Sequence, residues 1–513
     1  MSQNKETYKG IYAMHKYWGK KPFNEISKFI EKYSVKGDSV MDSFCGSGVT
    51  LVEALKLGRK CVGIDLNPIA IKLTEVSLTR VKPDRITDEY KIIENNLKKQ
   101  INSLYEMDYK GEKTTITHII WKNDDPIEVW YSTNNKRKLI RDGLPVDIEM
   151  SNKPLLQPKW YPKTLMFENS RINVSANQTV ADLFTPRAIV ALSLIAEEIN
   201  KIKDNDLRNV FQLTLSGTLS QASKLVFVIR RRSQNVDNNI SKAEVGSWVI
   251  GYWIPEEHFE INVWNCFENR FKRILKGENE IYSIFSNFPK NYFKDFVTLI
   301  NGSATNIPLE NASIDYVFID PPHSNRIPYM EQSLMWNAWL SLDNNIDWDN
   351  EIIVSEAKER KNKNDANYNN LLSLSFSEIS RVLKKDKYIS MAFNCLNDNT
   401  WINTLNAFIV NGFELDDIVP LEYSATSVVQ DNRKNALKTD FVLTFKNSKN
   451  TNLSKIKINN NSNILHNKIK SIIEYNPKIQ VYSVINILFQ ETIPKGYIFK
   501  ISEIIHICNL YMS

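Results

Sequence analysis

Near the start of the chain, an apolar run, a glycine-rich turn, a helix-forming stretch and a second apolar run follow one another directly. The first run and its turn read KGDSVMDSFCGSGVT over residues 36–50, and good helix formers continue to Leu57. Gly58 is a natural helix stop, and KCVGIDLNP then has the pattern of a second buried strand that ends in the acidic Asp65. Such a unit implies a parallel sheet with helices on its faces. The sequence therefore predicts an α/β fold.

This alternation stops at about residue 83 and resumes at about residue 292, which divides the predicted sheet along the sequence. Strands are expected within 295–323, 375–393, 412–428 and 439–447. We therefore predict a doubly wound, Rossmann-like sheet that is split by a large helical and mixed insertion. The predicted boundaries are 1–82 for the first part of the core, 83–291 for the insertion, 292–448 for the second part of the core, and 449–513 for a linker and a small C-terminal appendage.

Two helices are predicted inside the insertion. In ADLFTPRAIVALSLIAEEINKI, Thr185 has the place of a helix cap and Pro186 that of the first helical residue, and apolar residues recur at helical spacing. Residues 211–225, FQLTLSGTLSQASKL, have the pattern of a second packed helix.

The composition is that of a soluble globular protein, since 42% of the 513 residues are hydrophobic and 24% are charged. The sequence shows no secretion signal and no apolar run long enough to cross a bilayer, so the cytoplasm is the expected location. The five cysteines are scattered, so we expect reduced thiols and predict no metal. The formal net charge of +6 permits a polyanionic partner without demonstrating one. The basic runs Arg230–Arg232 and Lys358–Lys363 are candidates for phosphate contact, with a solvated surface as the alternative.

The first candidate site is the glycine turn from Asp42 to Gly48. It lies between a predicted strand and a predicted helix, where backbone N–H groups are exposed and no side chain blocks a ligand. A nucleotide-like ligand fits such a turn, and Asp65 at the end of the next strand can accept hydrogen bonds from both ribose hydroxyls. A glycine turn is a weak signal by itself, because Gly46 and Gly48 also fit an ordinary tight turn.

The second candidate site is Asp320-Pro321-Pro322-His323, which follows an apolar run and is expected at the carboxyl edge of the sheet, where ligands bind. The two prolines remove N–H donors and leave neighbouring carbonyl groups free to accept hydrogen bonds. An exocyclic base amine is a poor nucleophile, because its lone pair is delocalised into the ring. Acceptors at Asp320 and a proline carbonyl would localise that pair for attack on a sulfonium methyl. His323 could stack on a base rotated out of the duplex, although the same four residues also fit a turn.

Four segments, MHKYWGKKP, MDSFCGSGVT, GIDLNP and IDPPH, together resemble the motifs of the DNA amino-methyltransferase family of N6-adenine and N4-cytosine methylases. The resemblance extends over residues 12–72 and 296–446. It implies S-adenosyl-L-methionine as the cofactor, with the glycine turn at its methionine part, Asp65 at its ribose and the segment NGSAT at its adenine. The cofactor pocket that it implies is formed by His15, Lys21, Pro22, Asp42, Phe44, Gly46, Ser47, Gly48, Asp65, Asn67, Ser303 and Ala304.

The active-site tetrapeptide departs from the family pattern at one position. Its fourth residue is commonly Tyr, Phe or Trp, whereas here it is His323, which stacks less broadly. Its first residue, Asp320, is more typical of the adenine enzymes, while a serine is more typical of the cytosine enzymes. Adenine N6 is therefore the expected target, with cytosine N4 as the alternative.

The order of the motifs makes the insertion the expected target-recognition region, because the cofactor motifs precede it and the catalytic motif follows it. Double-stranded DNA with a flipped base is the expected partner, in a restriction-modification or phage-defence setting with a companion nuclease or defence protein, and no membrane partner is expected. The insertion offers basic and aromatic side chains for phosphate and base contact, many of which are expected to be core instead: Arg171, Arg187, Lys224, Arg230, Arg231, Arg232, Trp160, Tyr161, Trp248, Tyr252 and Trp253.

Other protein classes fit the sequence less well. A cytosine C5-methyltransferase needs a nucleophilic cysteine, generally after a proline, and none of the five cysteines follows a proline. Methylases of RNA or of protein glutamine carry a related Asn-Pro-Pro-Tyr motif, against which Asp320 and the long insertion argue. A dehydrogenase would not need the Asp-Pro-Pro segment, and its G-x-G-x-x-G spacing is missing. A non-catalytic DNA-binding subunit with a methyltransferase-like fold is the alternative from another class.

Overall fold

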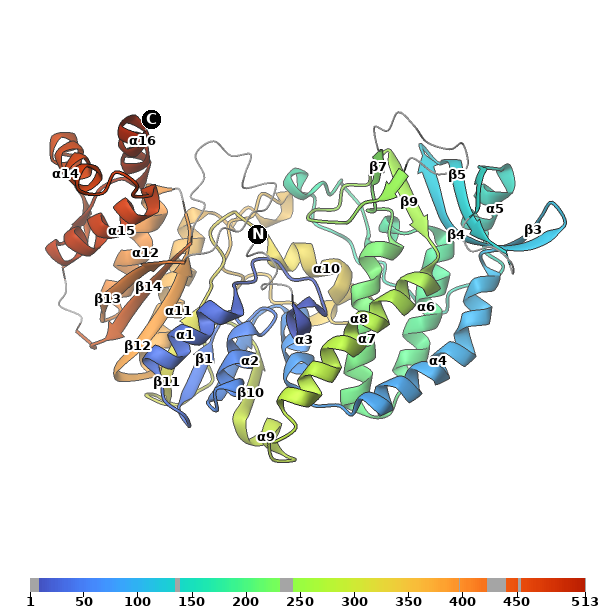
Figure 1. The fold of residues 1–513 in the computed structure, drawn as a ribbon, viewed down its shortest axis with the longest axis horizontal. Coiled ribbons are helices and arrows are strands. Elements are labelled where there is room, and N and C mark those ends of the chain that lie inside the picture. Colours follow the sequence, from blue (N-terminus) through green and yellow to red (C-terminus); the bar gives the residue numbers. More distant parts are fainter. Residues whose placement is uncertain are drawn as a thin grey trace.

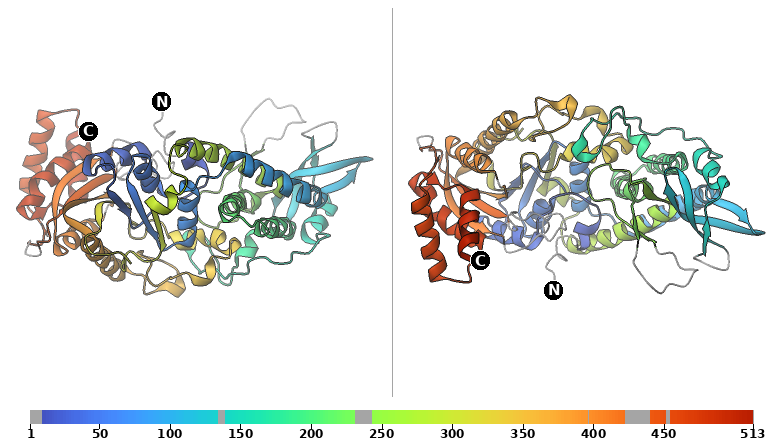
Figure 2. Two further views of the ribbon diagram at one scale, coloured as in Figure 1. Left: turned by 90° about the horizontal axis from the view of Figure 1, so that it is seen from below. Right: turned by 90° about the horizontal axis from the view of Figure 1, so that it is seen from above.

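The chain forms an elongated molecule, and its C-terminal helices lie at the opposite end from a small antiparallel sheet (Figures 1 and 2). A computed structural model describes residues 9–133, 139–230, 243–395, 397–421, 440–450 and 454–512. Within these ranges, no helix has the length and apolarity that a bilayer crossing needs.

A seven-stranded sheet forms the centre of the predicted core. Its strands lie in the order β10-β2-β1-β11-β12-β14-β13, and β14 runs opposite to the other six strands. The order reverses between β1 and β11, and in open α/β sheets ligands bind outside the carboxyl ends of the strands at such a point. The strands are β1 (Ser39–Asp42), β2 (Lys60–Asp65), β10 (Val297–Asn301), β11 (Ile314–Ile319), β12 (Leu383–Phe393), β13 (Phe413–Pro420) and β14 (Phe441–Asn447).

Helices cover both faces of this sheet, because its strands are apolar on both sides. Val40 and Phe318 pack into a core with α1–α3, whereas the adjacent residues Met41 and Val317 point to the other face and pack with α11 and α12. The Rossmann-like α/β prediction is therefore confirmed. The helices are α1 (Phe23–Tyr33), α2 (Val49–Lys56), α3 (Pro68–Leu78), α11 (Asp365–Val382) and α12 (Asp398–Val410).

The sheet is assembled from two stretches of sequence that the insertion separates. β2 pairs in parallel with β10, and β1 pairs in parallel with β11, although all of residues 83–291 lie between the partners. The short α9 (Tyr292–Phe296) leads into β10. The predicted closing strand over 412–428 is described only as far as Leu421, and residues 422–428 lie outside the described residues.

Helices make up much of the predicted insertion, and both helices expected there are present. The side chain of Thr185 accepts a hydrogen bond from the backbone N–H of Ala188 at 3.2 Å, and Pro186 is the first helical residue, as predicted. The second helix begins earlier than its predicted residues 211–225 and ends at Ala222. The helices are α4 (Pro83–Ser103), α5 (Pro145–Asn152), α6 (Pro186–Asn200), α7 (Asn205–Ala222) and α8 (Val263–Ile284).

The insertion also contains a five-stranded antiparallel sheet that the sequence reading did not predict. Its central strand, β4, pairs with β3, β5 and β9, and β5 pairs with β6. Asn123 and Asp124 join β4 to β5, and both have the positive φ angles that a tight hairpin turn requires. A separate pair of strands, β7 (Val228–Arg230) and β8 (Ala243–Val245), lies nearby. The sheet consists of β3 (Glu106–Tyr109), β4 (Glu112–Lys122), β5 (Asp125–Ser132), β6 (Leu139–Asp142) and β9 (Glu257–Ile261).

The C-terminal helices pack against the far edge of the seven-stranded sheet (Figure 1). Phe489 lies edge-on to Trp401 of α12, with ring centroids 5.3 Å apart. The segment 449–464, predicted as a linker, contains the short strand β15 and the buried Ile456, while residues 451–453 lie outside the described residues. The elements are β15 (Lys457–Ile458), α14 (Ser462–Tyr475), α15 (Val481–Thr492), β16 (Tyr497–Ile498) and α16 (Ile501–Met512).

Candidate active site

One pocket lies at the carboxyl ends of β1, β2 and β11, where the strand order reverses. Both predicted motifs contribute to it, so the glycine turn and Asp320 face the same cavity although they are far apart in sequence. Its walls include Tyr17, Trp18, Gly19, Lys20, Lys21, Asp42, Ser43, Phe44, Cys45, Gly46, Ser47, Thr50, Asp65, Leu66, Asn67, Ser303, Ala304, Asp320, Pro322, Tyr329, Met330, Asn350, Glu351 and Ile352.

The glycine turn can form only because two of its residues lack side chains. Gly46 and Gly48 have φ angles of 52° and 78°, in the left-handed region that other residues rarely adopt. A Cβ atom on Gly48 would lie 2.8 Å from the side chain of Thr74. Asp42, at the end of β1, stabilises the turn, because its carboxylate accepts a hydrogen bond from the N–H of Phe44 at 3.0 Å. Gly48 itself caps α2 and is not among the pocket-lining residues.

Asp65 joins the glycine turn to the second strand. One carboxylate oxygen accepts a hydrogen bond from the N–H of Gly46 at 2.8 Å, and the other accepts one from the N–H of Asn67 at 2.9 Å. Burial raises the pKa of Asp65 to about 6, against the effect of these two hydrogen bonds. The carboxylate therefore lies in the pocket wall that was predicted to face the ribose.

The side chain of Asn67 points to another helix, α10 (Tyr329–Trp339). Its amide nitrogen donates to the hydroxyl of Ser333 at 2.9 Å, and its oxygen accepts from the amide of Asn337 at 3.0 Å. Asn67 was predicted to bind the cofactor, but both polar ends of its side chain hold α10 in place. Its contribution to the pocket is therefore to connect α10, which carries Tyr329 and Met330, to the cofactor motif.

Asp320 lies directly after β11 and is paired with a lysine. The ammonium of Lys21 is 3.1 Å from one oxygen of Asp320 and 3.1 Å from one oxygen of Asp440, which directly precedes β14. Burial raises the pKa of Asp320 to about 6, while Lys21 opposes that rise and Asp440 adds to it. Lys21 was predicted to line the cofactor pocket, and it does so with its charge directed to Asp320.

His323 does not have the orientation that base stacking would require. Its side chain is only 6% exposed, lies edge-on to Phe393 and has one ring nitrogen 3.4 Å from the carbonyl oxygen of Ala392. Burial lowers the pKa of His323 to about 3, so the imidazole is neutral at ordinary pH. Pro322 lines the pocket, and its carbonyl accepts a hydrogen bond from the hydroxyl of Tyr368 at 2.9 Å, whereas Pro321 and His323 are not among the lining residues.

Two residues of the N-terminal motif also differ from their predicted positions. His15 is buried behind the glycine turn, where its ring lies edge-on to Trp336 and 3.1 Å from the hydroxyl of Ser216. Pro22 directly precedes the first residue of α1. Neither side chain lines the main pocket, and the cofactor contacts of His15 and Pro22 stay predictions.

Several pocket residues were missed by the sequence reading. The rings of Tyr17 and Tyr329 stack with centroids 5.9 Å apart. The buried carboxylate of Glu351 accepts a hydrogen bond from the N–H of Met330 at 3.1 Å and lies 2.8 Å from Arg360. Tyr17 lies inside the quoted MHKYWGKKP motif, and Asp440, like Asp320, is an acid next to an apolar strand. Tyr17 and Asp440 therefore each had a signal in the sequence. Glu351 had none.

The candidate recognition residues divide into core and surface. Arg187 is fully buried and paired with Glu260 at 2.9 Å, and Trp248 and Tyr252 are also buried, so these three belong to the core, which was the alternative given for them. Trp160 and Trp253 are exposed. Tyr161 and Lys224 are partly buried. Arg171 forms an ion pair with Glu356, and Arg230 forms one with Glu257. Arg231 and Arg232 lie outside the described residues.

The second basic run is also only partly at the surface. Arg360 is buried and pairs with Glu331 and Glu351, each at 2.8 Å. Lys363 is buried and donates hydrogen bonds to backbone carbonyls. The proposed phosphate contact is therefore wrong for these two residues of Lys358–Lys363, because their charges hold the loop that follows α10.

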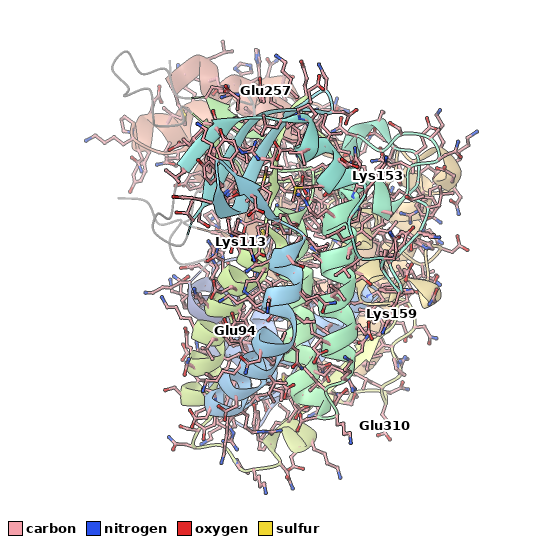
Figure 3. All side chains as sticks on the ribbon, turned by 90° about the vertical axis from the view of Figure 1, so that its right-hand side faces the viewer. Glu94, Lys113, Lys153, Lys159, Glu257 and Glu310 are labelled. Carbon is pink, nitrogen blue, oxygen red and sulfur yellow. The ribbon has the colours of Figure 1, made fainter. Side chains whose placement is uncertain are left out.

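Charges of both signs are interspersed on the end of the molecule that carries the small sheet. Figure 3 labels Lys113 and Lys153 on this face together with Glu94 and Glu257. Lys113 pairs with Glu106 at 2.7 Å, and Glu94 pairs with Lys98 at 2.7 Å. Among the residues of this face that the structure describes, these charges are therefore of both signs and are paired.

The Rossmann-like sheet brings the glycine turn and the Asp-Pro-Pro segment to one pocket, as the sequence motifs predicted. Comparison with known proteins agrees, because residues 1–76 match the family model described as DNA methylase. The chain is 21% identical over 355 residues to the type II methyltransferase M.MjaII of Methanocaldococcus jannaschii. The aligned region covers 64% of this chain and 62% of that protein. It is 22% identical over 332 residues to the type II methyltransferase M.MvaI of Kocuria varians, which covers 63% of this chain and 54% of that protein.

These matches confirm the resemblance to the DNA amino-methyltransferase family. Among solved structures, a SAM-dependent methyltransferase from Methanosarcina mazei aligns with 82% of this chain and 96% of that chain, at 9% identity and a TM-score of 0.25. The chain spans less than two thirds of the length of both curated relatives.

Proposed function

We propose that this protein transfers a methyl group from S-adenosyl-L-methionine to an exocyclic amine of a base in double-stranded DNA. The observation that carries this proposal is the shared pocket, in which the glycine turn after β1 and Asp320 after β11 face one cavity. A cofactor and a target group that must react need to meet within a few ångströms, and the switch point of the sheet brings their two motifs together.

The pocket residues fit the cofactor in size and polarity. The turn at Gly46 would face the methionine part, and Asp65 would accept hydrogen bonds from the ribose hydroxyls. Ser303 and Ala304 line the same pocket, and we assign them to the adenine end. When bound, the cofactor supplies an electrophilic methyl group on its sulfonium.

Asp320 is the proposed catalytic residue. Its carboxylate would accept a hydrogen bond from the target amine, with the Pro321 carbonyl as a second acceptor, and these bonds would localise the nitrogen lone pair toward the methyl group. Direct transfer of this kind needs no covalent intermediate on the protein. Because the His323 ring packs against Phe393, we assign it to supporting the Asp320 loop instead of stacking on the base.

Adenine N6 is the proposed target, with cytosine N4 as the alternative, and the argument rests on the aspartate at position 320. We further propose residues 83–291 as the target-recognition region and a restriction-modification or phage-defence setting for the enzyme. The exposed Trp253 and Trp160 on this region support that assignment, since aromatic side chains suit contact with bases.

The proposal is tested by incubating the pure protein with tritiated S-adenosylmethionine and unmethylated genomic DNA. We expect label in DNA, and we expect Asp320→Ala to abolish it while calorimetry still detects cofactor binding. Base-resolution modification sequencing of the product identifies the base. Absence of label with the wild-type protein would favour a non-catalytic DNA-binding subunit. Loss of both methyl transfer and cofactor binding in Asp320→Ala would contradict the role given to Asp320.

A further inference from the structure

Lys21 lies between two carboxylates that come from different strands of the sheet. Its ammonium is 3.1 Å from Asp320, which follows β11, and 3.1 Å from Asp440, which precedes β14. β14 runs antiparallel to β12, with Phe441 opposite Phe393. The beginning of β14 therefore reaches the same edge of the sheet as the ends of the parallel strands, and this reversal brings Asp440 into the active site.

Asp440 is held more firmly than Asp320. The amide of Asn394, directly after β12, donates a hydrogen bond at 2.7 Å to one oxygen of Asp440, and Lys21 contacts the other. The side chain of Asp440 is 10% exposed, compared with 23% for Asp320. Burial alone would raise the pKa of Asp440, but Lys21 and the hydrogen bond from Asn394 hold it well below its usual range. Asp440 is therefore a fixed anion, while Asp320 faces the pocket.

We propose that Asp440 is a positioning residue that shares the Lys21 ammonium with Asp320. Lys21 keeps Asp320 ionised, and Asp440 gives Lys21 a second anion to bind when the target amine displaces it from Asp320. The inference rests on the proposed methyl transfer to DNA, because it assigns Asp320 as the acceptor of the amine. When no target base is bound, an N–H of Lys21 contacts Asp320 in the place of the target amine. When the amine enters, its N–H replaces that of Lys21, and Lys21 keeps its contact with Asp440.

The charges around Asp320 explain why it needs Lys21 as a counter-ion. A buried carboxylate without a counter-ion takes up a proton, and a protonated Asp320 would lose the anionic acceptor that the amine requires. His323 cannot serve, since burial keeps its imidazole neutral. The titratable and charged groups that face Asp320 are Lys21, Asp440, His323, Arg326, Asp42 and Tyr329.

Two substitutions should shift the titration of Asp320 in opposite directions. Lys21→Met removes the nearby cation, so the pKa of Asp320 should rise by about one unit or more. Asp440→Asn removes a like charge and leaves Lys21 to Asp320 alone, so the pKa of Asp320 should fall. Lys21→Arg keeps the charge and should largely restore the wild-type value. A merely structural role for Lys21 and Asp440 would not produce shifts of opposite sign.

The direct measurement is a ¹³C titration of the aspartate carboxyl groups in the full-length protein, with the Asp320 signal assigned by its loss in Asp320→Asn. Lys28→Met on α1 and Asp417→Asn on β13 are matched controls, because Lys28 is exposed and pairs with Glu25 while Asp417 pairs with the exposed Lys32. The controls should leave the Asp320 titration unchanged. An unchanged titration in both Lys21→Met and Asp440→Asn would overturn the inference whether or not the protein methylates DNA.

Methyl transfer to genomic DNA gives the second readout. In Lys21→Met, we expect the acidic limb of kcat/KM to move to higher pH and the rate at neutral pH to fall about tenfold. In Asp440→Asn, Lys21 competes more strongly with the target amine, so KM for DNA should rise while the acidic limb moves to lower pH. Wild-type protein that transfers no methyl group would contradict the proposed function, and the carboxyl titration would still decide the coupling.

Discussion

The carboxylate of Asp65, at the end of β2, accepts a hydrogen bond at 2.8 Å from the backbone N–H of Gly46 in the turn that follows β1. Two neighbouring strands are thereby tied together at the cofactor pocket. The other oxygen of Asp65 binds the N–H of Asn67, whose side chain holds α10. A single carboxylate therefore connects the glycine turn, the second strand and the helix that closes the pocket.

Replacing Asp65 should weaken cofactor binding as well as the fold. Asp65→Ala removes the proposed ribose acceptor and leaves the N–H groups of Gly46 and Asn67 without their partner, so we expect at least a tenfold loss of S-adenosylmethionine affinity by calorimetry. Asp38→Ala, at a partly buried position before β1, is the comparison variant. Wild-type affinity in Asp65→Ala would contradict the ribose assignment.

Gly48→Ala should disturb the turn through a clash as well as through backbone strain. Gly48 and Gly111 have nearly equal φ angles, 78° and 79°, but a Cβ atom on Gly48 meets Thr74 at 2.8 Å, whereas one on Gly111 meets nothing within 4 Å. Gly111→Ala should therefore cost only the strain of the left-handed conformation, about 1–2 kcal/mol. Gly48→Ala should cost more than Gly111→Ala in chemical denaturation and should also reduce cofactor affinity. Equal losses of stability would show that Thr74 moves aside without cost.

The pH dependence of stability should carry a contribution from Asp42. Burial raises the pKa of Asp42 to about 7, so the folded state holds this proton more tightly than the unfolded chain does. Its stabilising contribution is fully present below the unfolded pKa, about 3.9, and is lost as the pH rises toward 7. Asp42→Asn cannot lose a proton, so its melting temperature relative to wild type should increase between pH 4 and pH 7. A constant difference over this range would contradict the raised pKa.

Glu351 is expected to act on both the pocket and the loop after α10. It lines the cofactor pocket, accepts a hydrogen bond from Met330 and pairs with the buried Arg360. Glu351→Gln keeps the shape but removes one of the two anions on Arg360, so we expect a loss of about 1–3 kcal/mol in unfolding free energy and weaker cofactor binding. Glu356→Gln, which breaks the more exposed pair with Arg171, should change stability by less than about 1 kcal/mol. Equal losses of unfolding free energy in Glu351→Gln and Glu356→Gln would contradict this role of Glu351.

The sequence predicted the residues that follow parallel strands and missed those that depend on strand direction. Asp42, Asp65 and Asp320 each end an apolar run, and parallel strands bring such ends to one edge. Asp440 begins an apolar run, and nothing in the local sequence shows that β14 is reversed. Its place beside Asp320 is therefore a property of the assembled sheet.

Charged residues in the insertion were misread for a related reason. Arg187 resembles a phosphate-binding residue when read alone, but its partner Glu260 comes from β9, far along the chain. The small antiparallel sheet that carries Glu260 was itself missed, although the hairpin turn at Asn123 and Asp124 was a usable signal. Pairing between distant segments decides whether such a charge is buried, and one sequence does not contain that information.

The two tryptophans Trp253 and Trp248 should separate DNA contact from core packing in the proposed recognition region. Trp253 is 56% exposed, so Trp253→Ala should leave the unfolding free energy within about 0.5 kcal/mol of wild type. Trp248 is 8% exposed and packs edge-on to Trp18 and Trp336, so Trp248→Ala should cost about 3–5 kcal/mol. If residues 83–291 contact the target, Trp253→Ala should weaken binding of duplex DNA severalfold in fluorescence anisotropy, with cofactor affinity unchanged. Unchanged DNA binding in Trp253→Ala, with Asp320→Ala also binding normally, would place the recognition surface elsewhere on the molecule.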